Sequence, residues 1–239
     1  LALSNENKFF NEQAFVLASF DLSGIQSFIY KTEIQHALRR LRSKSIYLGL
    51  LSEHLANTII ERIGLTRANI LYIGGGRCNM LLPNTHVAKN IFTQTLKDAN
   101  TWLLNTFEID LFIGSGYAEC TGNELQNKDI NGEIMKDSFE KIRKHLEIMI
   151  NQSKQNRFTP KLLYTLNNKE PEDNERECSS CGARRKLLTM ADGKTRCSFC
   201  RDFADMSTQL LKDDVCFIIS DKDKNEPRFE FPFTAEKSC

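Results

Sequence analysis

Apolar positions in the first half of the chain fall into two patterns, short continuous runs and stripes at helical spacing. Four strands are indicated by continuous runs at 15–20, 70–73, 80–82 and 109–113. Stripes at about 43–63 and 88–103 indicate two amphipathic helices, the second with an Asn84 or Thr85 cap. This order of elements, βαββαβ, is that of a ferredoxin-like domain. We therefore predict an α+β fold with an antiparallel, mixed sheet that carries both helices on one face.

The second half of the chain is less regular. A third helix is predicted from Glu133 to about Gln155, with one apolar face formed by Met135, Phe139, Ile142, Leu146 and Met149. Residues 167–177 are polar and mostly acidic, which is typical of a linker, and 215–219 form a short apolar strand. The predicted organisation is a first domain at 1–132, a helical extension at 133–166, the linker at 167–177, a cysteine module at 178–214 and a returning or next-domain strand at 215–239.

A glycine triplet lies between the second and third apolar runs. Gly74, Gly75 and Gly76 are followed by Arg77, and strand, glycine turn, strand predicts a hairpin. Glycine adopts positive φ freely and lets another group approach the backbone closely. The arginine after the triplet could neutralise the charge of a phosphate.

Composition and charge exclude few functions. The chain has 239 residues, 41% hydrophobic and 26% charged, with a net charge of +1, so global charge neither favours nor excludes nucleic acid. No apolar run approaches the roughly 20 residues of a membrane span, and no signal peptide is visible. We expect a cytoplasmic protein without a membrane partner. The first residue is not Met and the sequence ends soon after a strand-like run, so we expect part of a longer protein.

Four of the eight cysteines form the strongest chemical signal. Two Cys-x2-Cys pairs, separated by fifteen residues, predict a structural zinc site in a small zinc-ribbon module, with the ligands Cys178, Cys181, Cys197 and Cys200. Gly182 permits a tight knuckle and Asp192-Gly193 a hairpin turn between the two pairs. The alternatives are two disulfides or free thiols. Basic residues around the pairs could bind nucleic acid, or could solvate the module or dock a neighbouring subunit.

Two other segments could contact an anionic ligand. Asp21 stands at a strand end before a turn of small residues that includes Ser23 and Gly24, and such a turn can hold a metal–phosphate group, although Asp and Ser are also common turn formers. The basic segment at 39–45 precedes or opens the first helix, where positive charge opposes the helix dipole. It indicates a nucleotide or RNA partner, or else an exposed basic turn.

Three segments together resemble one known family. The first runs from Phe20 to Tyr30 and resembles the family's DISGIQ-x-FIY signature, the second is 41–48, and the third is 71–85 with its LYIGGGR and LLPNT sequences. The family is the large subunit of type III CRISPR effector complexes, most similar to the Csm type of subtype III-A. The cysteine quartet also fits, and the resemblance covers nearly the whole chain.

The resemblance implies a palm domain of the polymerase and nucleotide-cyclase type. The full subunit of this family has a histidine–aspartate nuclease domain, two palms with ATP held between them, and a zinc module. With guide RNA and target RNA bound, it cleaves single-stranded DNA and joins ATP into cyclic oligoadenylate, with Mg or Mn ions held by a Gly-Gly-Asp-Asp turn of the second palm. The implied nucleotide contacts in this chain are Asp21, Ser23, Gly24, Gln26, Arg42, Gly74, Gly75 and Gly76.

Neither catalytic signature of the full subunit occurs in this sequence. No histidine is followed by aspartate, and no Gly-Gly-Asp-Asp is present. Metal-assisted phosphoryl transfer needs carboxylates, and Gly76-Arg77 supplies none there. We therefore assign no catalytic residue and expect the first, non-catalytic, ATP-binding palm together with the zinc module. The alternative is a non-catalytic scaffold that binds RNA and other subunits of the complex.

Overall fold

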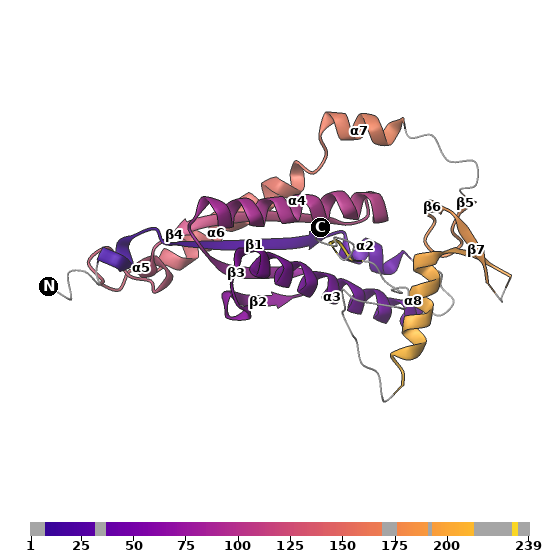
Figure 1. Ribbon diagram of the computed structural model, residues 1–239, viewed down its shortest axis with the longest axis horizontal. Helices are drawn as coiled ribbons and strands as arrows, with labels where there is room; N and C mark the ends of the chain where they lie inside the picture. Colours follow the sequence, from indigo (N-terminus) through magenta and orange to yellow (C-terminus); the bar gives the residue numbers. More distant parts are fainter. Residues whose placement is uncertain (1–7, 32–36, 169–175, 191–192, 213–230, 234–239) are drawn as a thin grey trace. The chain divides into compact units, whose positions relative to one another are not determined.

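The computed structural model describes residues 8–31, 37–168, 176–190, 193–212 and 231–233 (Figure 1). These residues form two compact units. Unit 1 comprises Leu1–Ser23 and Ser52–Phe158, and unit 2 comprises Gly24–Leu51 and Thr159–Cys239. Both units therefore contain segments that are distant in sequence. The predicted strand at 215–219 and most of the predicted linker lie outside the described residues.

The core of unit 1 is a four-stranded sheet. Its strands are β1 (Phe15–Ser23), β2 (Ile70–Gly74), β3 (Arg77–Pro83) and β4 (Phe112–Cys120). They lie in the order β2-β3-β1-β4, and every neighbouring pair is antiparallel. The central strand β1 is buried almost throughout, as the continuous apolar run predicts. The prediction of an α+β domain with an antiparallel sheet is confirmed, but the sheet is not mixed, because none of these strand pairs is parallel.

Helix α4 (His86–Phe107) packs against β4. Thr85 caps it by accepting a hydrogen bond from Ala88 N at 3.1 Å, and its predicted apolar stripe is buried. The Asn100 side chain bonds to both the N–H and the C=O of Ile113. The C-terminal part of α3 (Ala37–Ile63) lies beside α4, because Arg62 donates to Thr95 Oγ1 at 3.2 Å.

Helix α6 (Ser138–Gln155) covers the opposite face of the sheet, which the sequence prediction left open. Its buried residues Ile142, Leu146 and Ile150 form one cluster with Leu17 of β1 and with Ala118 and Cys120 of β4. Figure 1 shows α6 running along β1 and β4. The sheet of unit 1 is therefore covered on both faces, by α4 on one and by α6 on the other.

Three predicted boundaries are also corrected. The last strand is at 112–120 and not at 109–113, so Gly114 and Gly116 lie inside it. The third helix begins at Ser138, and Met135 is 41% exposed in the preceding loop, where α5 (Gly122–Leu125) is a single capped turn. Helix α3 begins by Ala37, so the basic segment is helical. A short 3-10 turn, Arg67–Asn69, precedes β2.

Unit 2 consists of short elements, and α2 (Ile25–Tyr30), the first half of α3 and α8 (Ser198–Gln209) meet through aromatic side chains. A further helix is α7 (Pro160–Asn167). Two small hairpins complete it, β5 (Arg176–Glu177) with β6 (Arg184–Arg185), and β7 (Leu187–Thr189) with β8 (Thr195–Cys197). The ring of Phe203 contacts those of Phe28 and Tyr47, with centroids 6.0 and 5.3 Å apart. Among the described residues, no helix combines the length and apolar character needed to cross a membrane.

Candidate nucleotide site and metal centre

The glycine triplet forms the predicted hairpin turn in unit 1. Gly74 ends β2, Arg77 begins β3, and the two are register partners across a two-residue turn. The turn residues Gly75 and Gly76 have φ of 59° and 87°, and positive φ at both positions is the requirement of a type I′ turn. Gly75 is exposed, and a Cβ added there would meet nothing within 4 Å. The tip of the hairpin is therefore open to an approaching group.

The hairpin turn is tied to the end of β1. Leu22 N donates to Gly76 O at 2.9 Å, and the Cα register places Asp21 opposite Arg77. Asp21, the half-buried Ser23 and the glycine turn thus lie at one end of unit 1, and we call this region the hairpin end. The structure brings together the part of the predicted nucleotide site that belongs to this unit.

The charges at the hairpin end are already paired. Asp21 accepts from Lys154 Nζ, and Arg77 donates to Glu147, with both partners supplied by α6. The side chains of Asp21 and Lys154 are 26% and 27% exposed, so this pair is partly shielded from water. Arg77 is therefore already paired with an acid and is not a free cation that a phosphate could bind. The sequence predictions did not include Glu147 and Lys154. The available signal was that these opposite charges are seven positions apart, which places them on one face of a helix two turns from each other.

The remaining predicted nucleotide contacts belong to unit 2. Gly24 has φ of 89° and stands at the N-cap of α2, so its glycine is required by the backbone. Gln26 and Arg42 are exposed on α2 and α3. Their role in nucleotide binding stays a prediction.

The basic segment at the start of α3 has a structural role at two of its positions. Arg40 is 5% exposed and donates to Ser180 Oγ at 2.9 Å, beside the cysteine module. Lys44 is 4% exposed and donates to the carbonyl oxygens of Phe28 and Lys31 at 2.8 and 2.7 Å. Both side chains therefore hold unit 2 together, and the interpretation of the whole segment as an exposed basic turn was wrong.

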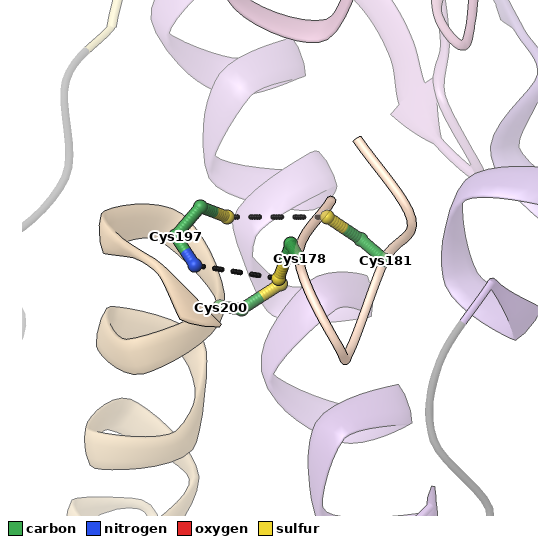
Figure 2. A group of neighbouring side chains, drawn as sticks. All are labelled: Cys178, Cys181, Cys197 and Cys200. Carbon is green, nitrogen blue, oxygen red and sulfur yellow. Dashed lines mark hydrogen bonds between the residues drawn. The ribbon is translucent and has the colours of Figure 1, made fainter. Parts of the chain in front are cut away.

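The four predicted metal ligands converge in unit 2. The sulfurs of Cys178, Cys181, Cys197 and Cys200 all lie within 4.8 Å of one another, and none forms a disulfide (Figure 2). The sulfurs of Cys181 and Cys197 are 3.9 Å apart. A tetrahedral zinc–thiolate centre with bonds of about 2.3 Å places its sulfurs about 3.8 Å apart. The four thiols fit a metal ion of this kind.

Backbone geometry supports the same conclusion. Gly182 has φ of 71° and its N–H bonds to Cys178 O at 2.8 Å, which closes the predicted knuckle. The N–H groups of Ser180 and Cys197 donate to Cys178 Sγ at 3.4 and 3.3 Å. Hydrogen bonds among the four thiols lower the pKa of Cys178 and raise the pKa of Cys197 and of Cys200, as expected of one tight cluster of interacting thiols.

Two further cysteines are unsuited to metal binding. Burial raises the pKa of Cys78 to about 12 and that of Cys120 to about 11, so both remain protonated at neutral pH. They pack inside unit 1. Cys216 and Cys239 lie outside the described residues.

Most basic side chains of the cysteine module have local partners. Arg184 pairs with Glu177 at 3.6 Å, Arg185 lies over the Phe199 ring, and Arg201 bonds to Asp202. Arg196 is buried. This favours a role of these charges within the module over an open nucleic-acid surface.

The comparisons with known proteins agree on one family. A family model described as Csm1 subunit domain B matches residues 14–169. The single-strand-specific deoxyribonuclease Cas10/Csm1 (subtype III-A) of Mycobacterium tuberculosis is 34% identical over 221 residues, 90% of this chain and 27% of the relative. The protein of the same description from Streptococcus thermophilus is 35% identical over 216 residues, with the same two shares. The chain thus spans about a quarter of the length of these relatives.

Solved structures of Csm1–Csm4 cassettes have a similar fold. A cassette in complex with AMPPNP matches with a TM-score of 0.58 and 30% identity, covering 67% of this chain and 22% of that one. A cassette in complex with cA4 matches with a TM-score of 0.55 and 31% identity, covering 62% and 20%.

Proposed function

The chain belongs to the Csm1 subunit family, and from this premise we propose that it supplies the non-catalytic, ATP-binding palm and a structural zinc ribbon to the large subunit of a type III-A CRISPR complex. The observation that carries the proposal is the hairpin end, where an open glycine turn is bonded to the end of β1 beside Asp21 and Ser23. The β2-β3-β1-β4 order supports a ferredoxin-like palm.

The exposed turn suits a nucleotide better than a protein side chain. Gly75 presents backbone without a Cβ, and consecutive N–H groups in such turns can face phosphate oxygens. Ser23 adds a hydroxyl at the same end. Among the described residues at this end, the carboxylates of Asp21 and Glu147 are already bound to Lys154 and Arg77, so neither is free to hold an ion. Ions that activate ATP would be held by another palm.

The activity of the whole subunit is part of this proposal. The relatives are single-strand-specific deoxyribonucleases, and the similar structures are Csm1–Csm4 cassettes with AMPPNP or cA4. We propose that the full subunit containing this chain cleaves single-stranded DNA and synthesises cyclic oligoadenylate. Its partners would be guide RNA, target RNA and a Csm4-like subunit. The four thiolates would hold zinc in a closed, structural site.

Synthesis by the full subunit tests the proposed nucleotide contacts. Replacing Ser23 with Trp fills the hairpin end, and we expect cyclic oligoadenylate synthesis to fall while target-dependent DNA cleavage persists. Replacing the exposed Thr208 of α8, away from the hairpin end in the sequence, with Trp serves as the control for added bulk. Unchanged synthesis in the Ser23→Trp subunit would remove the hairpin end from the ATP site.

A scaffold role is the second candidate. The buried positions of Arg40 and Lys44 and the local partners of the module's arginines argue against a broad RNA surface. Salt-dependent RNA binding by the chain, without ATP binding by the full subunit at the hairpin end, would favour the scaffold.

A further inference from the structure

Four charged side chains form a network at the hairpin end of unit 1. Asp21 and Arg77 belong to adjacent strands, and Glu147 and Lys154 belong to α6. Asp21 and Arg77 are direct register partners, so their Cβ atoms are close enough for the two to pair with each other. Each instead pairs with α6. The helix thus supplies one charge of each sign to the strand ends.

The close approach of α6 is built into the strand beneath it. A Cβ added to Gly116 would lie 2.7 Å from Met149 Cβ and 3.3 Å from Ile150 N, and one added to Gly114 would lie 3.1 Å from Ile150 O. Ser115 N also bonds to Ser153 Oγ at 3.2 Å. These contacts fix the helix turn that carries Lys154 directly over the sheet.

We propose that Lys154 takes the place of a metal cation at Asp21 and thereby excludes divalent ions from the hairpin end. A carboxylate at a strand end beside a phosphate-binding turn is a natural ligand for a hard divalent cation. Here the ammonium occupies that carboxylate. A metal ion would have to displace it and leave a partly shielded ammonium without its partner, which is unfavourable.

The inference deepens the proposed function, because it explains how this end can hold a nucleotide without a metal of its own. Arg77 and Glu147 also act against a metal ion. The position opposite Asp21, where a second acid could serve as a metal ligand, is occupied by Arg77, and Glu147 holds this cation in place. Lys154 acts through its pairing with Asp21 and is therefore a positioning residue. Its test needs no nucleotide, so its failure and the failure of nucleotide binding are separate results.

The test introduces a second acid and varies only residue 154. All variants of the full chain carry Arg77→Asp and Glu147→Gln, which place two carboxylates opposite each other without a third negative charge. Lys154 is kept, replaced with Arg, or replaced with Met. Mn²⁺ affinity is measured by electron paramagnetic resonance of free Mn²⁺. We expect the Lys154→Met variant to bind Mn²⁺ about tenfold or more tightly than the Lys and Arg variants, since two free carboxylates suit such an ion.

Two controls make the result specific. Adding Asp21→Asn to the Met variant should abolish the gained Mn²⁺ site, and circular dichroism shows whether each variant is folded. Equal Mn²⁺ affinity with Lys, Arg and Met at residue 154 would overturn the proposal, because the charge at that position would then not matter.

The native chain gives an independent test that requires no variant. Paramagnetic Mn²⁺ bound at Asp21 would broaden the amide resonances of Leu22 and Gly76 in nuclear magnetic resonance spectra. We expect these two signals to keep their line widths while Mn²⁺ is added to millimolar concentration. Selective broadening of both signals at lower Mn²⁺ would show that Lys154 does not keep the ion out.

Discussion

Single glycines in this chain serve two different physical purposes. Gly75 and Gly76 supply the positive φ of a turn, whereas Gly114 and Gly116 lie inside β4 and make room for the backbone of α6. A glycine in a strand often marks such a close approach. The two purposes lead to different expected effects of substitution.

Gly116→Ala should destabilise unit 1. The new methyl would lie 2.7 Å from Met149 Cβ and 3.3 Å from the Ile150 backbone nitrogen, so α6 has to shift. Overpacking of this kind costs about 1–3 kcal/mol in free energy of unfolding, measured by urea denaturation. The matched control is Gly49→Ala in α3, where a Cβ meets nothing within 4 Å and the change should stabilise the helix by about 1 kcal/mol. Equal effects of the two substitutions would contradict the close approach of α6.

The exposed turn should accept a residue that readily adopts positive φ. Gly75→Asn is expected to leave the folded state intact, because Asn adopts the left-handed region more readily than other residues and space is open at this position. The same substitution at Gly64, whose φ is 82° at the end of α3, carries a similar backbone cost. In the full subunit, we expect Gly75→Asn to weaken ATP binding, measured by equilibrium dialysis, and Gly64→Asn to leave it unchanged. Weakening by both would indicate a general loss of structure.

The sequence alone distinguishes the glycines of the turn from those of the strand only in part. The run Gly74-Gly75-Gly76 stands between two apolar runs, so the turn could be predicted. Gly114 and Gly116 also follow an apolar run, and the predicted strand therefore ended before them. What distinguishes them is α6, which is more than twenty residues further along the chain and packs on them only in the folded state.

The elements differ in how far local sequence determines them. Helix α4 has a clear cap and an uninterrupted apolar stripe, and its buried positions were predicted correctly. Helix α3 was expected to begin at about Ser43, because its apolar stripe starts near that position. The helix nevertheless begins earlier, since Arg40 and Lys44 find hydrogen-bond acceptors in unit 2 that the local sequence does not reveal.

The cysteine centre should stabilise more of unit 2 than the two Cys-x2-Cys turns themselves. Arg40 of α3 bonds to Ser180 between the first two cysteines, and Phe203 follows the last one and contacts Phe28 and Tyr47. Removal of the metal by a chelator should therefore increase hydrogen exchange at 178–200 and also at the first half of α3. The sheet of unit 1 has its own core and should stay protected. Metal binding supplies on the order of 10 kcal/mol to such modules, so the change should be large.

Variants identify the ligands in the same measurement. Cys200→Ser should release the metal, detected by inductively coupled plasma spectrometry, and reproduce the exchange pattern of the chelated protein. Cys78→Ala, at a buried cysteine of unit 1, should retain the metal. Purified native protein that contains no metal, or exchange that does not change on chelation, would contradict a structural metal centre.

At the scale of the whole molecule, the glycine turn of unit 1 is not accompanied by a free acid in the part of the chain that the structure describes. The hairpin end keeps the turn, the adjacent strand end and one acid, but α6 neutralises that acid and the residue after the turn is a neutralised arginine. The cysteine quartet was predictable from spacing because its ligands lie within 23 residues. The charge network was not, because Asp21 and Lys154 are separated by 133 positions and meet only through packing of α6.

We propose that ATP binds at the hairpin end of this chain within the full subunit. Hydrogen exchange of the full subunit with and without AMPPNP tests it most directly. We expect slower exchange in peptides that cover Leu22–Gly24 and Gly74–Arg77 when the nucleotide is bound. Protection confined to peptides outside this chain, with exchange at both of these segments unchanged, would contradict it.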